Sequence, residues 1–261
     1  LYMQLGAPGY GDLGLASRME MAEAARETRP SQADAEAELP TGLNPDVQAG
    51  YSDLVQRLRG AVAERPDDLQ GHVLLARSEA ALGNYVAAYS AQERVIVLRG
   101  DAATARDYAD LADMMVLAAG GYVSPEAERV LETALRRDPE NGIAQYYMGL
   151  MMAQTGRPDI AFRVWDRLLR ASPSDAPWLP PILAQMEEMA FRAGVPDYEV
   201  PRIAGLPGPT AEDVEAAGEL SVEERQEMIR GMVSRLSERL ANEGGPPEDW
   251  ARLIASLGVL G

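Results

Sequence analysis

The sequence contains no cysteine, no lysine, a single histidine and only two phenylalanines in 261 residues. Without cysteine, the chain cannot form a disulfide, a thiolate metal site or a thiol nucleophile. The single histidine, His72, cannot supply a metal site that needs several imidazoles, and it makes a His-based catalytic triad hard to build. No run of residues is long and apolar enough to cross a bilayer. These absences turn the search from catalysis toward binding.

Positive charge is also scarce. The chain has 41 acidic residues against 24 basic ones, all of them arginine, and its formal net charge is −17. Binding to phosphate requires cations, so this balance argues against a nucleic-acid partner and against anionic membrane surfaces. Long-range attraction of a basic partner and simple solubility would both account for the acidity, and the sequence leaves both open.

Apolar helical stretches end at regular intervals along the chain. Pro66, Pro139 and Pro173 each close one stretch, and Gly100 follows Pro66 at the interval that separates Pro139 from Pro173. This interval of ~34 residues, with small residues in a first helix, a glycine turn and alanine in a second helix, is typical of tetratricopeptide (TPR) repeats. We therefore expect an all-α fold, a TPR-type antiparallel helix-pair superhelix with an irregular N-terminal segment.

The sequence divides into three predicted regions. Residues 1–49 are expected to form an irregular N-terminal segment, with a short helix over 17–28, and a mobile acidic linker over 29–46. Residues 50–194 are expected to form the TPR array. Residues 195–261 read as a linker plus C-terminal helices that match a truncated further repeat. The natural protein is therefore expected to continue past this chain, unless its last helix packs in another way.

The array is predicted to hold three full repeats, over residues 69–100, 101–139 and 140–173. The second repeat is longer because the turn between its helices is expanded to AAGGYVSP. Ser124 is predicted to cap the helix that follows this turn, with Pro125 at the first helical position, where its missing N–H has no cost.

Three motifs are compatible with chemistry, but each has a simpler structural explanation. The GxGxxG pattern over residues 9–14 lacks the preceding strand and following helix that nucleotide binding requires. Met148, Met151 and Met152 recur at helical spacing, where methionine usually fills a core, and no His or Cys accompanies them. His72 lies in the first turn of a predicted helix without a paired nucleophile, so a surface or capping role is favoured. The sequence predicts no enzyme, no cofactor and no metal.

The concave face of the array, lined by the first helix of each repeat, is the candidate binding site. Counting outward from the core positions places eight residues on this partner-binding groove: Val73, Arg77, Arg106, Asp113, Val116, Ile143, Tyr146 and Leu150. Tyr146 and Leu150 suit the anchoring of an amphipathic helix, although burial by the next helix would also explain an aromatic residue at position 146. Because lysine is absent, the carboxylate clamp of other TPR proteins is not expected.

Several segments together resemble one family. They are LYMQLGAPGYGDLGL and RPSQADAEA near the start, then ERPDDLQGHVLLARSEAALGNYVAAYSAQERVI and RRDPENGIAQYYMGLMMAQTGRPDIAFRVWDRLL in the repeats. The combination is similar to the CcmI (CycH) family of bacterial cytochrome c maturation. The repeat motifs are shared with every TPR protein, whereas GAPGY followed by RPSQ is far more specific. Gly11 and Gly14 stand where the family pattern PGYPDLPL has prolines, a departure that bears only on the stiffness of this segment.

The resemblance implies the periplasmic domain of a bacterial inner-membrane protein, anchored only through membrane segments absent from this chain. It implies that the domain binds and holds apocytochrome c, chiefly by its C-terminal helix, and delivers it to the haem-ligation complex of CcmF and CcmH. CcmE, which carries haem, is a further implied partner. A chain without cysteine cannot form mixed disulfides with an apocytochrome. The alternative is a TPR scaffold that bridges other envelope assembly proteins without a client of its own.

Overall fold

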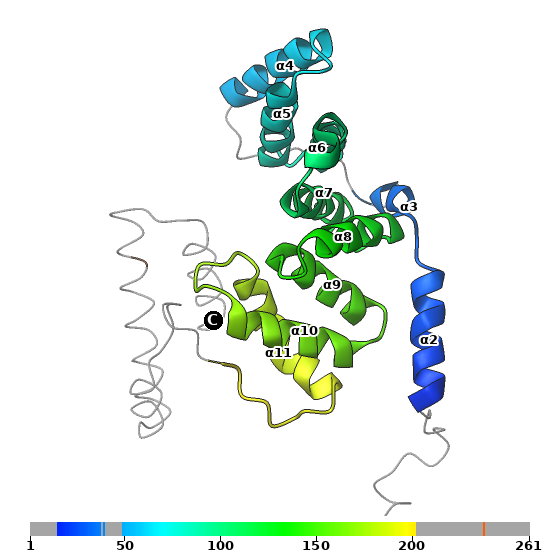
Figure 1. Ribbon diagram of the computed structural model, residues 1–261. Coiled ribbons are helices and arrows are strands. Elements are labelled where there is room, and N and C mark those ends of the chain that lie inside the picture. The colour runs from blue at the N-terminus through cyan, green and yellow to red at the C-terminus, as the bar shows by residue number, and fades with distance from the viewer. Residues whose placement is uncertain (1–14, 38, 40–48, 202–236, 238–261) are drawn as a thin grey trace, which may run out of the picture. The chain divides into compact units, whose positions relative to one another are not determined.

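Every regular element that the structure describes is a helix. The computed structural model describes residues 15–37, 39, 49–201 and 237. Its elements are α2 (Leu15–Glu27), α3 (Gln32–Ala37), α4 (Ala49–Glu64), α5 (Leu69–Ala81), α6 (Tyr85–Arg99), the 3-10 turn η1 (Gly100–Ala102), α7 (Ala105–Ala118), α8 (Pro125–Arg137), α9 (Gly142–Gln154), α10 (Pro158–Ala171) and α11 (Leu179–Arg192) (Figure 1). The predicted all-α class is confirmed. The GxGxxG motif and the C-terminal helices lie outside the described residues.

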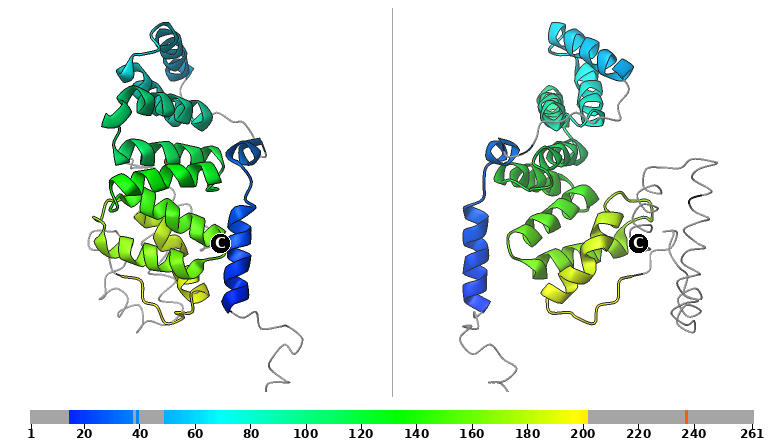
Figure 2. Two further views of the ribbon diagram at one scale, coloured as in Figure 1. Left: turned by 45° about the vertical axis from the view of Figure 1, so that its right-hand side comes forward. Right: turned by 180° about the vertical axis from the view of Figure 1, so that it is seen from behind.

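Consecutive helices pack against each other from α4 to α11. The pairs α5–α6, α7–α8 and α9–α10 correspond to the three predicted repeats, and α6–α7 and α8–α9 contacts join one pair to the next. The first helices α7 and α9 also contact each other (Figures 1 and 2). α4 packs on α5 before the first pair, and α11 packs on α10 after the last. The arrangement is the one expected of TPR-type helix pairs, and it gives α7 and α9 a common face.

Local signals in the sequence set the helix boundaries. Ser124 caps α8 by accepting a hydrogen bond from the helix backbone at 3.0 Å, and Pro125 occupies the first turn, as predicted. Thr104 and Asp107 form a capping box at the start of α7, in which each side chain accepts from the backbone N–H of the other residue. Gly156, with φ of 81°, makes the turn between α9 and α10, a left-handed conformation that glycine adopts without strain.

Small residues allow the paired helices to approach closely. Alanines on both helices of each pair are completely buried, among them Ala88, Ala112, Ala127 and Ala161. At Gly149 in α9, a Cβ atom would lie 2.2 Å from Nε1 of Trp165 in α10, so the indole fills the space that any side chain would need. Trp165 is fully buried and donates its indole N–H to the Tyr146 carbonyl at 3.0 Å. The third repeat is therefore built around one large ring that rests on a glycine.

The first helix pair buries polar side chains beside its apolar ones. Glu79 of α5 is only 1% exposed, and its carboxylate accepts hydrogen bonds from Nε and Nη2 of Arg59 in α4 at 2.6 and 2.7 Å. Asn84 donates a third bond to this carboxylate at 3.0 Å. Gln92 of α6 is also buried and donates to the Asp107 carbonyl at 2.9 Å. The apolar pattern of the sequence did not predict these contacts. The pair of Arg59 and Glu79 also holds α4 on α5.

The N-terminal helices carry charged groups that meet the array. α2 covers the helix predicted over residues 17–28, and α3 follows it within the predicted linker. Arg26 and Arg29 both form ion pairs with Glu128 of α8, whose side chain is buried. A second bond joins Nη1 of Arg29 to the Val123 carbonyl at 3.2 Å. Arg29 itself is buried to the same degree as Glu128, so the pair is shielded from solvent.

Gln32 extends this contact through its amide. Its Nε2 donates to the Met115 carbonyl at 2.8 Å, and its Oε1 accepts from the Ser124 hydroxyl at 2.6 Å. The prediction of a mobile linker is therefore wrong for residues 29–37, because polar groups in this stretch satisfy buried partners on the array. The rest of that predicted linker, apart from Leu39, lies outside the described residues. The division into three regions stays a prediction.

Candidate binding groove

A pocket of about 250 Å³ lies where α7 and α9 approach the start of α11. Its lining comes from one residue of α7, three of α9 and three at or next to the start of α11: Asp113, Ile143, Tyr146, Tyr147, Pro177, Trp178 and Pro181. Because α7 and α9 are first helices in contact with each other, the pocket lies on the face that the first helices share. Three residues predicted for the groove, Asp113, Ile143 and Tyr146, meet in it.

Four other predicted groove residues lie outside this pocket. Val73, half-buried, and Arg77, exposed, are on α5. Arg106 is on α7 with 81% of its side chain exposed. Leu150 of α9 is half-buried and packs against the core of the second and third repeats. Their contribution to partner binding stays a prediction.

Val116 differs from the sequence expectation. It is 1% exposed and belongs to the apolar cluster formed by α7, α8 and α9. Its placement on the groove is therefore wrong, because a buried side chain cannot contact a partner. The physical reason is that α7 packs against α6, α8 and α9 together, which makes its buried face wider than a single helix pair requires. Ala109, two turns before Val116 on the same face of α7, is fully buried for the same reason.

Tyr146 belongs both to the groove and to the packed interior. Its ring stacks on Trp165, with 6.0 Å between ring centroids and 19° between planes, and it meets the Tyr147 ring at 4.8 Å. The side chain is half-buried and lines the pocket. The two interpretations of this aromatic therefore describe its two sides: one side packs on α10, and the other borders the pocket.

Asp113 is the acidic group of the pocket. The Tyr147 hydroxyl donates a hydrogen bond to its Oδ1 at 2.5 Å. Burial raises the pKa of Asp113, and the bond from Tyr147 only partly opposes that effect. Burial also raises the pKa of Tyr147, with the neighbouring Asp113 charge acting in the same direction. Tyr147 therefore stays a neutral donor, and Asp113 is a carboxylate that a positive charge would stabilise.

A second acid, Asp110, lies one turn before Asp113 on α7. Burial raises its pKa; the Arg106 charge opposes this, and the Asp113 charge adds to it. Nε of Arg106 lies 3.8 Å from Oδ2 of Asp110, and the charge of Arg77 acts on Asp110 more weakly. The two predicted groove arginines are therefore associated with Asp110, which leaves the Asp113 carboxylate to its tyrosine partner.

Sequence reasoning missed Tyr147 and Trp178. Tyr147 falls on the core side of α9 by helical periodicity, so only the contact across to α7 reveals its role. Trp178 lies over the start of α9: a Cβ at Gly142 would come within 2.2 Å of its Cζ2. Its indole N–H also donates to the Ser172 hydroxyl at 2.7 Å. The sequence held one signal for this contact: Gly142 stands at the start of a helix, and Trp178 follows the next helix.

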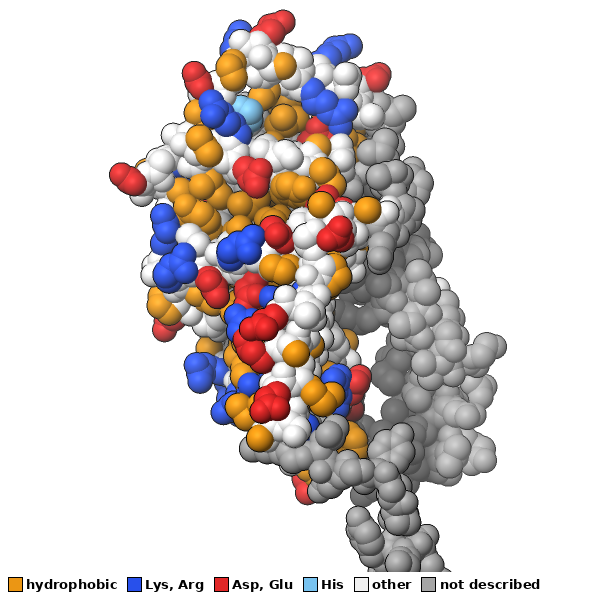
Figure 3. All heavy atoms as spheres, turned by 90° about the vertical axis from the view of Figure 1, so that its right-hand side faces the viewer, with side chains coloured by type: hydrophobic (Ala, Val, Ile, Leu, Met, Phe, Trp, Pro, Cys, Tyr) orange, Lys and Arg blue, Asp and Glu red, His pale blue; other side chains and the backbone are white. Residues whose placement is uncertain are grey.

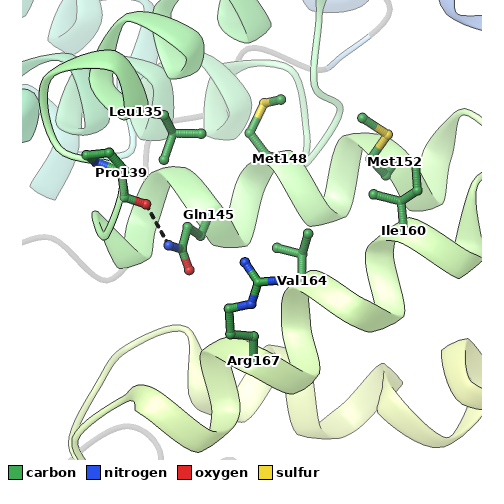
Figure 4. Close-up of a pocket in the computed structure, with 8 residues that line it drawn as sticks. All are labelled: Leu135, Pro139, Gln145, Met148, Met152, Ile160, Val164 and Arg167. Atoms are coloured by element: carbon green, nitrogen blue, oxygen red, sulfur yellow. Dashed lines mark hydrogen bonds between the residues drawn. The ribbon is translucent and has the colours of Figure 1, made fainter.

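A second pocket, of about 350 Å³, lies between α8, α9 and α10 (Figure 4). It is largely apolar, with Met148 and Met152 of α9 facing Ile160 and Val164 of α10. At its edge, Nε2 of Gln145 donates to the carbonyl of Pro139 at 2.7 Å. The pocket is lined by α8, α9 and α10, and it shares no lining residue with the pocket that holds Asp113.

The methionines and the histidine that the sequence singled out lie in packed or capping positions. Met151 is fully buried, whereas Met148 and Met152 border the second pocket. Nε2 of His72 lies 3.1 Å from the Pro66 carbonyl, beside the helix start. Within the described part of the chain, no group of three or more His, Cys, Asp or Glu side chains is placed to hold a metal ion. None of the described helices combines the length and apolarity that a membrane span needs.

The face drawn in Figure 3 mixes charges rather than presenting one sign. On the face drawn in Figure 3, acidic, arginine and hydrophobic side chains alternate over short distances. Many of the arginines are paired with an acid on the same helix, as Arg163 is with Asp159 at 3.5 Å and Arg170 with Asp166 at 2.9 Å. Such exposed pairs contribute little to stability. The electrostatic features that can select a partner are therefore local ones, such as Asp113.

Two known proteins are similar to this chain. One is the cytochrome c-type biogenesis protein CycH of Bradyrhizobium diazoefficiens, 29% identical over 261 residues, which is all of this chain and 61% of that protein. The other is the cytochrome c-type biogenesis protein CycH of Rhizobium meliloti, 34% identical over 207 residues, which is 79% of this chain and 52% of that protein. No family model matches the sequence. The chain thus spans between about half and three-fifths of the relatives' length.

Proposed function

Because the chain belongs to the CycH (CcmI) family of cytochrome c-type biogenesis proteins, we propose that it binds apocytochrome c and delivers it for haem ligation. A role in cytochrome c maturation is supported by both relatives, which are named for that process and not as enzymes. On this proposal, the groove holds the C-terminal helix of the apocytochrome before haem is attached. The backbone of such a client becomes ordered when it binds. Because this ordering costs conformational entropy, we expect a moderate affinity.

The observation that carries the proposal is the pocket between α7, α9 and α11. It combines an apolar side chain, Ile143, with the aromatic rings of Tyr146 and Trp178 and the carboxylate of Asp113. Interfaces that grip an amphipathic helix use buried aromatic and aliphatic anchors with a few polar groups to fix its orientation. The pocket offers both kinds of group on one face of the array.

The same proposal extends to partners and location. It places the domain in the periplasm, as part of a protein of the inner membrane. There it would pass its client to CcmF and CcmH, with CcmE as the carrier of haem. The family resemblance supports these assignments.

The test is a titration of the chain with a peptide of the C-terminal helix of a c-type cytochrome. Two matched variants locate the site: Ile143→Arg alters the groove, and Ile160→Arg alters the second pocket, and both replace a half-buried isoleucine on a helix. We expect saturable binding that Ile143→Arg weakens at least tenfold, the loss of about 1.4 kcal/mol typical of an interface anchor. We expect Ile160→Arg to bind as the unaltered chain does. No saturable binding to the unaltered chain would refute the proposal.

A scaffold without a client is the second candidate, and the apolar pocket beside α10 is the observation that favours it. A scaffold would retain its assembly partners in a pull-down from which apocytochrome is absent. It would also lose them in Ile160→Arg and keep them in Ile143→Arg. The same two variants therefore separate the two functions.

A further inference from the structure

Asp113 stands out among the acids of the array by its partner. Each acid that the array buries is held by arginine: Glu79 by Arg59, Asp107 by Arg99, and Glu128 by Arg26 and Arg29. Asp113 is half-buried and forms no ion pair with any arginine of the described residues. Tyr147 hydrogen-bonds to its Oδ1, and no described residue donates to its Oδ2. A partly desolvated carboxylate without a cation is unfavourable unless a ligand supplies one.

The rings around Asp113 suit a cation rather than an anion. Tyr146 and Trp178 border the same pocket, and the faces of such rings attract ammonium and guanidinium groups electrostatically. Asp110, one turn away on α7, adds negative potential even with Arg106 beside it. An anionic ligand would meet repulsion from both carboxylates.

The size of the pocket suits a single side chain. Its volume of about 250 Å³ lies below the ~300–1,000 Å³ of pockets that enclose a drug-sized molecule. A metal ion is disfavoured because the described residues bring no third acidic or imidazole ligand to the site. The long stems of lysine and arginine can lie along apolar surface with the charge at the tip. Ile143 and the prolines of the pocket supply that apolar surface.

We propose that this pocket receives one lysine or arginine side chain of the bound polypeptide, with the charged end at Asp113 beside the rings of Tyr146 and Trp178, and the stem against Ile143 and the prolines. The inference rests on the proposed function and deepens it, because it names the residue type that the groove selects. The groove would then recognise a basic amphipathic segment by its register: one cation is placed in the pocket, and the apolar residues of the same helical face lie along α9.

A charge-swap titration tests the proposal. The probe is the cytochrome C-terminal-helix peptide, together with a series in which each lysine or arginine is replaced in turn by glutamine. We expect one member of the series to bind the unaltered chain roughly tenfold more weakly, a loss typical of a close charge pair. Asp113→Asn, which keeps the size of the side chain and an acceptor for Tyr147, should bind the original peptide and that member equally. Asp101→Asn, which removes the same charge from an exposed position before α7, should keep the preference.

A second measurement uses the unaltered chain alone and so does not depend on how a variant folds. The preference for the original peptide over the selected member should vanish as pH falls through the raised pKa of Asp113, since the protonated acid no longer attracts the cation. If every member of the series binds with equal affinity, or if Asp113→Asn retains the full preference, the cation pocket is refuted while the proposed function stands. If the original peptide does not bind at all, the cation pocket and the proposed function are both refuted.

Discussion

The first and third repeats have the same helix-pair architecture but different interiors. Gln92 stands as far after Ala76 as Trp165 stands after Gly149, and Glu79 corresponds in the same way to Met152. In the third repeat these positions hold the fully buried ring of Trp165, which rests on Gly149, and the half-buried side chain of Met152. In the first they hold a buried carboxylate and an amide, each satisfied by a partner on a neighbouring helix. The pair geometry therefore does not require an interior that is apolar throughout, provided that every buried polar group is bonded.

The two interiors also have different consequences. The Trp165 ring fixes α10 on α9 and, through its bond to the Tyr146 carbonyl and its stacking on the Tyr146 ring, supports the groove wall. The Glu79 carboxylate instead reaches Arg59 and so attaches α4. The third repeat shapes the candidate site, whereas the first repeat joins the helix that precedes the array.

The largest expected effect comes from truncating the two corresponding residues. Trp165→Ala should lower the free energy of unfolding by about 4 kcal/mol, because it opens a large cavity against Gly149. Gln92→Ala should cost about 1 kcal/mol, mainly by leaving the Asp107 carbonyl without its donor. Urea unfolding followed by circular dichroism measures both. Equal losses for the two variants would contradict the contrast between the interiors.

The second effect concerns the ion pair of the first repeat. Glu79→Ala should cost about 2 kcal/mol, less than a fully buried pair would, because Arg59 is 40% exposed and can turn to water. Replacing both partners, Arg59→Met with Glu79→Met, should return the stability to within about 1 kcal/mol of the original, since an apolar pair needs no desolvation. A double variant no more stable than Glu79→Ala would show that the repeat depends on the charges themselves.

The contact between the N-terminal helices and the array has a predicted pH dependence. Burial alone would raise the pKa of Glu128, but the hydrogen bonds from Arg26 and Arg29 outweigh it, so that its folded-state pKa is lowered. The pair therefore stabilises the contact above the ordinary carboxyl pKa, and this contribution is lost as pH falls through the lowered pKa.

A variant tests the same contact at neutral pH. Glu128→Gln should speed trypsin cleavage after Arg26 about tenfold, which corresponds to a loss of about 1.4 kcal/mol in holding α2 on the array. Glu140→Gln, at an exposed position just after α8 and in no ion pair among the described residues, is the matched control and should leave the rate unchanged. Identical rates for Glu128→Gln and the unaltered chain would contradict the docked arrangement.

The smallest effect is expected at exposed pairs on the helix surfaces. Arg163→Ala removes a partner of Asp159 on α10 and should change the stability by about 0.3 kcal/mol, an effect that moderate salt abolishes. Asp159 keeps its second partner, Arg157, at 2.9 Å. A loss of stability as large as that of Glu79→Ala would mean that burial does not decide which ion pairs stabilise the fold.

The repeat period was enough to predict the helix pairs and their turns. Pro66, Gly100, Pro139 and Pro173 mark where helices end, and Ser124 with Pro125 marks where one begins; the structure has these boundaries. Such signals act within one turn of the chain, so they can be read locally. The placement of Asp113, Ile143 and Tyr146 on a common face followed from the same spacing.

The rest depended on contacts between residues far apart in sequence. Gln32 looked like part of a polar linker because nothing nearby indicates the Ser124 hydroxyl and the Met115 carbonyl that it bonds. Val116 was placed outward because a single helix pair does not include the contact of α7 with α9. Trp178 was missed because its partner, Gly142, precedes it by two helices. Periodicity describes one helix and its neighbour, whereas the groove is made by three.

Hydrogen exchange of the chain with and without the cytochrome C-terminal-helix peptide tests the central claim most directly. The account predicts that bound peptide slows amide exchange in α7, α9 and residues 177–181, and leaves α8 and α10 unchanged at the second pocket. Slowed exchange confined to α8 and α10, with none in α7 or α9, would contradict the claim that the shared face of the first helices is where the client binds.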